Sequence, residues 1–303
     1  MRILTYTVTE ADAGRAVRTV VPRRFCLGQH AFRRLKVRGA IRIGGAPVRA
    51  DYILHAGETI EVHLPSDMAQ ESDTRADAMP GLPPSFLRYQ DEDLLIVSKG
   101  APLPTLPARH ITSGTLREQV MQMLRADPET FVYHPVNRLD KGTSGLLCIA
   151  RHAHAQRLLT GQLHTGGFIR EYLAVTEGVP ATPAGTIDAP IARLGAGARR
   201  AVRSDGQRAV THYRVERVSG NRALVRLRLE TGRTHQIRVH LSHIGCPIAG
   251  DYLYGTALDA LSGRFALHSA SIRLTQPITG EIIALSEPLP QALEELLAVH
   301  DLT

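Results

Sequence analysis

The sequence predicts an α+β fold, in which a domain built on a mixed, largely antiparallel sheet follows a small α/β module. Three observations predict it. After residue 86, strand-like and helix-like stretches do not alternate one for one, which argues against a doubly wound sheet. Two alternating stretches, 209–218 and 223–230, lie close enough in the chain to form a hairpin. The charge is distributed unevenly, which separates a basic module from a larger basic domain.

This charge distribution sets the expected domain boundaries. Residues 1–65 carry eleven basic and five acidic side chains, a net +6, and residues 66–93 carry two basic and seven acidic ones, a net −5. The stretch 66–85 is rich in Asp, Pro and small polar residues and has no periodicity, which is typical of a linker. We therefore expect a module at 1–65, an acidic linker at 66–85 and a larger domain at 86–303.

Composition excludes several classes of protein. Apolar residues make up 43% of the 303 residues, which excludes a wholly disordered chain. No apolar run reaches the roughly 18 residues that cross a bilayer. Residues 1–10 alternate like a strand and lack the features of a signal peptide, so we expect a cytoplasmic protein. The three cysteines lie far apart and form no CxxC pair, which predicts buried small side chains instead of disulfides or a zinc site.

Arginine supplies almost all of the basic charge. Only Lys36, Lys99 and Lys141 are lysines, which leaves 33 arginines among the 36 basic residues. A guanidinium group suits phosphate and can stack on bases, so this bias is compatible with a nucleic-acid partner. A GC-rich genome would give the same bias, so the charge alone does not decide whether the chain binds RNA.

In the first module, residues 15–42 carry apolar side chains at helical spacing. A helix there would bury its apolar side and leave Arg33, Arg34 and Lys36 in solvent. An alternating strand is expected at 58–64. With glycines at 39, 44, 45 and 57, this order of elements resembles the small alpha-L RNA-binding module of ribosomal proteins, over about residues 12–65.

The larger domain shows short apolar strands and amphipathic helices. Residues 224–230 alternate between apolar and charged side chains, which indicates a half-buried strand with a basic face. Thr234 is the expected N-cap of a helix that Gly245 and Pro247 would end. The other expected strands are 94–97, 145–150 and 172–176, and the other expected helices are 116–124 and 153–163.

The densest group of chemically active residues lies at 136–145, before an expected strand. Arg138 and Lys141 flank the carboxylate of Asp140, and two glycines allow a tight backbone. Opposite charges keep a carboxylate ionised, the form that a nucleophile or base requires. From spacing alone, an ordinary surface ion pair is the favoured explanation of these residues.

This segment, Val-Asn-Arg-Leu-Asp-Lys-Gly-Thr-Ser-Gly, resembles the signature of RluA-type pseudouridine synthases. The resemblance continues through the stretches 170–173 and 231–240, and then through 245–251, 254–255, 267–269 and 277–281. It covers about residues 86–290, and the three main motifs occur in the family's order. An alpha-L module is a known N-terminal companion in this family.

The resemblance implies an RNA-modifying isomerase that needs no cofactor and no metal. Asp140 would be the catalytic carboxylate, Arg238 would pair with it, and Tyr172 would stack on the uracil and take the C5 proton. Arg138 would hold the extruded state of the uridine, and Arg233 would contact phosphate. The RNA-contacting residues expected overall are Arg138, Arg233, Asn137, Lys141, Arg33, Arg34 and Lys36.

The sequence departs from the family's pattern at two places, and both departures bear on the choice of substrate more than on the catalysed reaction. The family usually has histidine where Asn137 stands, and asparagine can hydrogen-bond but cannot carry charge. The family's Lys-Pro-Xaa-Gly loop appears here at 99–104 as Lys-Gly-Ala-Pro-Leu-Pro. The backbone of that loop must therefore differ.

Two rival functions remain open at this stage. A metal-dependent hydrolase would use His235, His240, His243 and His268, although helical spacings of five and three do not bring the first two to one face as a spacing of four does. A non-catalytic RNA-binding protein would not need Asp140. We expect a monomer that acts on RNA, with ribosomal RNA favoured over transfer RNA because of the module.

Overall fold

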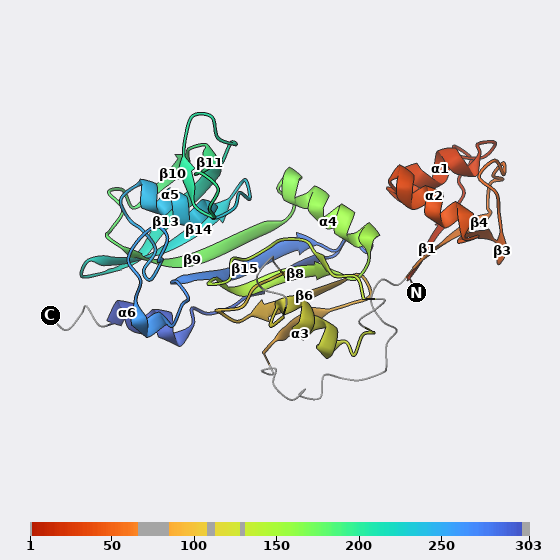
Figure 1. The fold of residues 1–303 in the computed structure, drawn as a ribbon. Helices are drawn as coiled ribbons and strands as arrows, with labels where there is room; N and C mark the ends of the chain where they lie inside the picture. The colour runs from red at the N-terminus through yellow and green to blue at the C-terminus, as the bar shows by residue number, and fades with distance from the viewer. Residues whose placement is uncertain (1, 66–84, 108–112, 128–130, 299–303) are drawn as a thin grey trace.

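The computed structural model describes residues 2–65, 85–107, 113–127 and 131–298 (Figure 1). The predicted linker lies outside the described residues except for Ser85, so the domain boundaries stay a prediction. No helix in these ranges is both long and apolar enough to cross a membrane.

The N-terminal module is a four-stranded antiparallel sheet with two helices. The strands run in the order β1-β4-β2-β3, and the apolar sides of sheet and helices share one core. This confirms the strand expected at 58–64. The elements are β1 (Arg2–Thr7), α1 (Val17–Arg24), α2 (Gln29–Val37), β2 (Ile41–Ile43), β3 (Ala46–Pro47) and β4 (Thr59–Leu64).

The helical pattern over 15–42 does not form one helix, which corrects the sequence-based prediction. Helix α1 ends at Arg24, and the backbone is extended at Gly28 before α2 begins. Cys26 lies in this break with a φ of 48° and is exposed, although it was expected to be buried. In α2, Leu35 is buried while the basic side chains around it are exposed, as expected.

The larger sheet is mixed and largely antiparallel, which confirms the predicted fold class. The strands run in the order β10-β13-β14-β9-β15-β8-β6-β5, with β16 paired to β15 and β7 to β8. Among the pairings of the described strands, only β15 with β8 is parallel. The strands are β5 (Leu87–Gln90), β6 (Leu94–Lys99), β7 (His134–Pro135), β8 (Ser144–Ala150), β9 (Ile169–Glu177), β10 (Ala184–Asp188), β13 (Val210–Ser219), β14 (Arg222–Leu229), β15 (Leu267–Thr275) and β16 (Ile282–Ser286).

Helices cover both faces of this sheet (Figure 1). Successive side chains of a strand point to opposite faces, so Leu95 and Val97 enter one core and Leu94 and Ile96 the other. The first core also receives side chains from α3 and α6, and the second receives them from α4. The helices are α3 (Leu116–Met123), α4 (Ala153–Thr165), α5 (Gln236–His243), the short η1 (Asp259–Leu261) and α6 (Gln291–Ala298).

Candidate active site

Asp140 lies in the loop between β7 and β8, and packing at the start of β8 shapes this loop. Gly145 has a φ of +105°, and a Cβ there would lie 2.3 Å from the backbone oxygen of Ser269 on β15. A Cβ on Gly142 would lie 2.6 Å from the ring of Phe265. Only glycine allows both approaches, so the two glycines of the motif let the Asp140 loop pack against β15 and against Phe265, which precedes it.

Arg238 of α5 joins Asp140 to a second carboxylate. Its Nη1 donates to Oδ2 of Asp140 at 3.1 Å, while its Nε and Nη2 donate to both oxygens of Asp251 at 2.7 and 2.8 Å. The side chains of Arg238 and Asp251 are 2% and 0% exposed, whereas that of Asp140 is 29% exposed. Asp251 therefore holds Arg238 in a fixed position, and Arg238 in turn orients the accessible carboxylate of Asp140.

The surroundings of Arg238 hold its guanidinium in place and in its charged form. Burial opposes the charge, but hydrogen bonds and charges from Asp251 and Asp140 outweigh it, so the pKa of Arg238 lies above its ordinary value. The guanidinium also stacks over the ring of Phe265, at 4.2 Å from the centroid. One side chain thus links the Asp140 loop, α5 and the segment before β15.

His235 precedes α5 and lies close to Asp140. It is the N-cap residue, with a left-handed φ of 59°, so the prediction that Thr234 caps this helix is wrong. Its Nε2 lies 3.9 Å from Oδ2 of Asp140, and its Nδ1 shares a hydrogen bond of 2.9 Å with the hydroxyl of Tyr254. Burial lowers the pKa of His235, and the charge of Asp140 acts in the opposite direction. A left-handed backbone at a residue other than glycine is common at functional sites.

The segment 99–105 holds the backbone on both sides of Asp140. The hydroxyl of Thr105 donates to the carbonyl oxygen of Leu139 at 2.7 Å and accepts from its amide at 3.3 Å. The amide of Leu103 donates to the carbonyl oxygen of Lys141 at 2.8 Å. Hydrogen bonds therefore hold the Asp140 loop just before and just after the carboxylate.

Lys99 completes this attachment from inside the protein. It is 1% exposed, and its Nζ donates to the carbonyl oxygens of Gly100, Leu103 and Lys141 at 2.9, 2.7 and 3.4 Å. Burial lowers its pKa to about 7, and the Asp140 charge acts against that shift. The segment 99–104 therefore holds the Asp140 loop in place although its sequence departs from the family's pattern.

Replacing Thr105 by valine tests this attachment. Valine has nearly the shape of threonine but leaves the buried Leu139 amide and carbonyl without the hydroxyl, at a cost of about 1–3 kcal/mol. We expect kcat of the reaction predicted for Asp140 to fall about tenfold, because small displacements of a reacting group are costly. KM should stay within about twofold, since the RNA surface is unchanged.

Thr105→Ser is the matched control, because serine keeps the hydroxyl. Steady-state kinetics that show equal kcat values for the valine and serine variants would contradict the role of Thr105.

Tyr172, the predicted stacking residue, has no bond to Asp140 within the described part of the chain. Tyr172 is buried on β9, in the same core as Leu139 and Ile237, the neighbours of Asp140 and Arg238 in sequence. Among the described residues, no hydrogen bond joins its hydroxyl to the candidate carboxylate. Tyr172 therefore shares a core with Leu139 and Ile237, and within the described residues it has no hydrogen bond to the Asp140–Arg238 pair.

Four predicted RNA contacts lie near this pair. Arg138, Lys141 and Arg233 are exposed and can reach a bound RNA. Asn137 is buried, and its Oδ1 accepts a hydrogen bond of 3.1 Å from the amide of Cys148. The prediction that Asn137 contacts RNA is therefore corrected: its amide group attaches the loop to β8.

The histidines of the metal hypothesis do not converge. His240 is buried and uses both ring nitrogens on protein groups, Thr211 Oγ1 and the carbonyl oxygen of Ala189, each at 2.9 Å. His268 lies on β15, where its Nδ1 bonds to Ser144. Among the residues that the structure describes, no group of three or more His, Cys, Asp or Glu side chains could hold a metal.

Sequence reasoning gave no role to Asp251 or Thr105, named Lys99 only as part of the altered loop at 99–104, and gave His235 a role only in the metal hypothesis. One signal was available for Asp251: it follows the apolar segment 247–249, and an acidic group that is buried with such a segment needs a partner. The partners themselves come from distant parts of the chain. Thr105 and Leu139, for example, lie 34 residues apart.

Comparison with known proteins identifies a family for this arrangement. Residues 93–243 match the family model described as RNA pseudouridylate synthase. The chain is 36% identical to the uncharacterized RNA pseudouridine synthase YjbO of Bacillus subtilis over 260 residues, covering 86% of this chain and 90% of that protein. It is 38% identical to the ribosomal large subunit pseudouridine synthase D of Xanthomonas campestris over 278 residues, covering 86% and 81%.

A solved structure shows the same relationship. The human RNA pseudouridylate synthase domain containing 1 matches with a TM-score of 0.54 and 25% identity, over 72% of this chain and 94% of that one. The residues 93–243 include Asp140, Tyr172 and Arg238, so the family match and the geometry concern the same site. The chain belongs to the RluA-type family of RNA pseudouridine synthases and is an isomerase that converts uridine in RNA to pseudouridine.

Proposed function

We propose that this enzyme modifies uridines in ribosomal RNA and that Asp140 is its catalytic carboxylate. One observation carries the assignment of Asp140: the buried Arg238–Asp251 pair orients a carboxylate that remains accessible to a substrate. Relatives named ribosomal large subunit pseudouridine synthase D support the choice of ribosomal RNA. The basic helix α2 of the N-terminal module supports it as well.

The reaction breaks the N1–C1′ bond of the uridine and forms a C5–C1′ bond, and the C5 hydrogen leaves as a proton while N1 gains one. Atoms and electrons balance without an oxidant or a reductant. Asp140 either attacks C1′ of the ribose, attacks C6 of the uracil or assists the loss of uracil. Arg238 orients it in each route, because the guanidinium stays bonded to the buried Asp251.

The uridine must leave a base stack to reach Asp140. Arg138 is exposed two residues before Asp140, which suits it to fill the space that the uridine vacates. The resemblance to the family assigns to Tyr172 an aromatic face for the extruded uracil and a hydroxyl that can take the C5 proton directly or through water.

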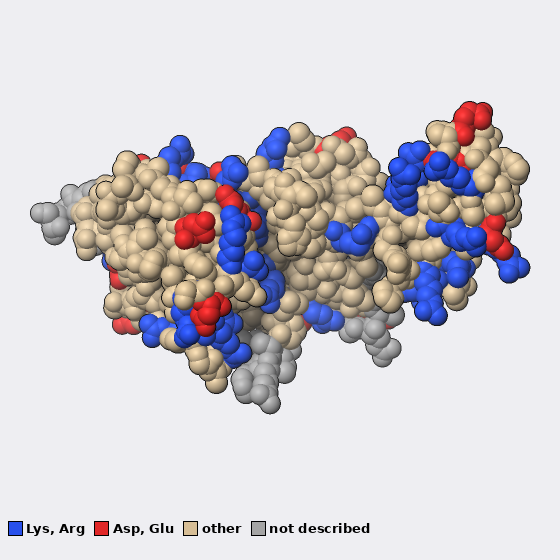
Figure 2. Space-filling model, turned by 90° about the horizontal axis from the view of Figure 1, so that it is seen from above, with Lys and Arg blue, Asp and Glu red and all other residues tan. Residues whose placement is uncertain are grey.

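Basic side chains are available for the rest of the RNA. Figure 2 shows Lys and Arg side chains along a hollow between the surface over α4 and the surface over β10–β14. RNA affinity should fall steeply with salt, because each phosphate contact releases counterions.

The assay that tests the proposed substrate is tritium release from RNA labelled at uridine C5. Large-subunit ribosomal RNA and a set of transfer RNAs are each incubated with the enzyme. We expect release from ribosomal RNA, followed by mapping of the modified positions. Release from transfer RNA alone would overturn the ribosomal assignment, and release from neither RNA would overturn the proposed substrate class.

The double variant Arg33→Gln with Lys36→Gln tests whether the module takes part. Both side chains are exposed on α2. If both contact phosphate, the slope of log affinity against log salt should decrease in magnitude by about 1.4–1.8, at roughly 0.7–0.9 per contact. Binding titrations at several salt concentrations measure it.

The control is Arg214→Gln with Arg217→Gln, which removes the same charge from exposed positions of β13. An equal change of slope in both double variants would argue against a specific role for α2.

A further inference from the structure

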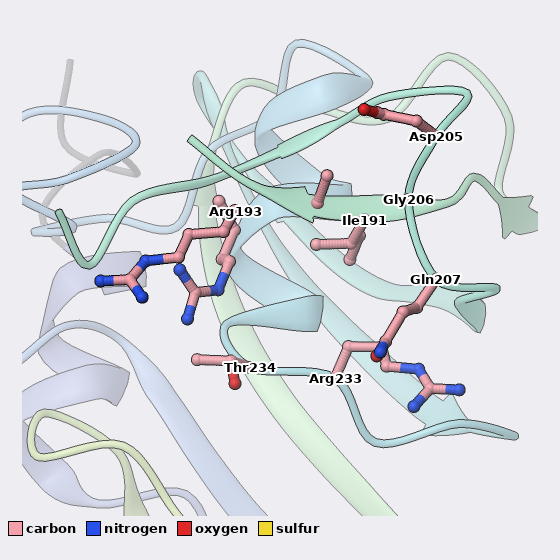
Figure 3. A pocket seen from close by; sticks show the side chains of 9 residues that line it. Ile191, Arg193, Asp205, Gly206, Gln207, Arg233 and Thr234 are labelled. Carbon is pink, nitrogen blue, oxygen red and sulfur yellow. The ribbon is translucent and has the colours of Figure 1, made fainter. Parts of the chain in front are cut away.

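A basic pocket of about 370 Å³ lies between the β11–β12 hairpin and the residues that precede α5 (Figure 3). The hairpin consists of β11 (Ile191–Arg193) and β12 (Arg200–Val202). In Figure 3, Arg193 lies on one side of the pocket and Arg233 with Gln207 on the other, with Thr234 between them. Three arginines from three segments, Arg193, Arg200 and Arg233, line this space.

The positive charges of the pocket are not neutralised within the described part of the chain. Arg193 and Arg200 face each other directly in the hairpin register, where like charges destabilise a strand pair. The guanidinium groups of Arg193 and Arg233 donate to backbone carbonyl oxygens, with Nε of Arg193 at 3.0 Å from Gly197 O and Nε of Arg233 at 2.9 Å from Arg208 O. None of the three arginines forms an ion pair with a described residue.

Asp205, the acidic residue that lines the pocket, does not neutralise the three arginines. Asp205 is bound by Arg203 through two hydrogen bonds of 2.9 and 3.0 Å, and that arginine does not line the pocket. Three guanidinium groups around one open space are therefore available to an anion from outside. The planar donor fork of arginine matches phosphate oxygens.

The pocket connects directly to the candidate carboxylate. The backbone amide of Arg200 donates to the hydroxyl of Tyr254 at 2.8 Å, and that hydroxyl shares a hydrogen bond of 2.9 Å with His235. His235 lies 3.9 Å from Asp140 and directly follows Thr234, which lines the pocket. An anion bound here would lie next to the place where the uridine reacts.

We propose that this pocket binds a phosphodiester group of the RNA strand next to the reacting uridine, with Arg193 and Arg200 as the new contacts beside Arg233. The inference rests on the proposed function, because it takes Asp140 as the reacting carboxylate. The pocket fixes the register of the strand, so that one uridine and not its neighbour enters the site.

The experiment uses a short RNA whose modified uridine has been mapped with the wild-type enzyme. In a series of such RNAs, one phosphodiester at a time is replaced by a neutral methylphosphonate. The double variant Arg193→Gln with Arg200→Gln is compared with the wild type, and Arg217→Gln is the control, since that arginine is exposed on β13 and pairs with Glu294 of α6. Dissociation constants, salt slopes and rates of tritium release are measured.

We expect the double variant to bind the unmodified RNA about tenfold more weakly, with a salt slope smaller in magnitude by roughly 0.7–1.8. One methylphosphonate position beside the target should weaken binding to the wild type about tenfold and to the double variant much less, because the two changes remove the same contact. The control should behave like the wild type at every position.

Two outcomes overturn the inference and differ from failure of the proposed function. If every methylphosphonate weakens the wild type and the double variant equally, no phosphate is bound in this pocket although the enzyme is active. If the double variant loses no more affinity than Arg217→Gln, the pocket arginines do not contact RNA. Failure of the proposed function would instead appear as wild-type enzyme that releases tritium from no RNA tested.

Discussion

Asp140→Asn should reduce tritium release from uridine-labelled RNA by about 10⁴-fold or more, the size of loss that follows removal of a catalytic nucleophile. Asparagine has the shape of aspartate but neither its charge nor its ability to attack carbon. It can still accept a hydrogen bond from Arg238, and that arginine keeps its pair with Asp251. The substitution therefore removes the chemistry and leaves the surrounding network in place.

Two measurements separate loss of chemistry from loss of structure. The thermal unfolding midpoint should shift by only a few degrees, since one partly exposed hydrogen bond is worth about 0.5–1.5 kcal/mol. RNA affinity should stay within about threefold of the wild type, because no phosphate contact changes. Asp140→Asn enzyme that releases tritium at more than a tenth of the wild-type rate would rule out Asp140 as the catalytic carboxylate.

Arg238→Lys should produce the second largest effect, a decrease of about 10²-fold in kcat. Lysine keeps the positive charge but presents a single ammonium group in place of the planar fork. It cannot reproduce the two bonds to Asp251 and the bond to Asp140 at once. We also expect the free energy of unfolding to decrease by about 1–3 kcal/mol, because a buried carboxylate loses part of its hydrogen bonding.

Arg226→Lys is the matched control. Arg226 on β14 also bonds to two carboxylates, those of Glu216 and Glu171, but it lies on the charged outer face of the sheet. This variant should keep kcat within about twofold, since surface ion pairs contribute little. Single-turnover kinetics at saturating RNA compare the two variants. Equal kcat values in the two variants would show that the Arg238 network does not position Asp140.

The sequence alone determined the parts of the molecule that depend on local pattern. The alternation in 224–230 predicted a strand with an apolar and a charged face, and β14 has them, with Val225 and Leu227 fully buried. The apolar run at 94–97 became β6, buried on both faces. The motif around Asp140 was recognisable because its glycines, its arginine and its aspartate stand next to one another in the chain.

Tertiary structure decided which distant groups meet. Asp251 pairs with Arg238, Thr105 fastens Leu139 and Arg193 faces Arg200 because strands and loops far apart in sequence are packed together. The break between α1 and α2 and the burial of Asn137 also depend on which neighbours fill the space around them. Periodicity reports only which side of an element is apolar. The partner of a polar side chain depends on which elements pack together in the folded core. The hydrogen-bond partners of Asp140 therefore could be identified only from the structure.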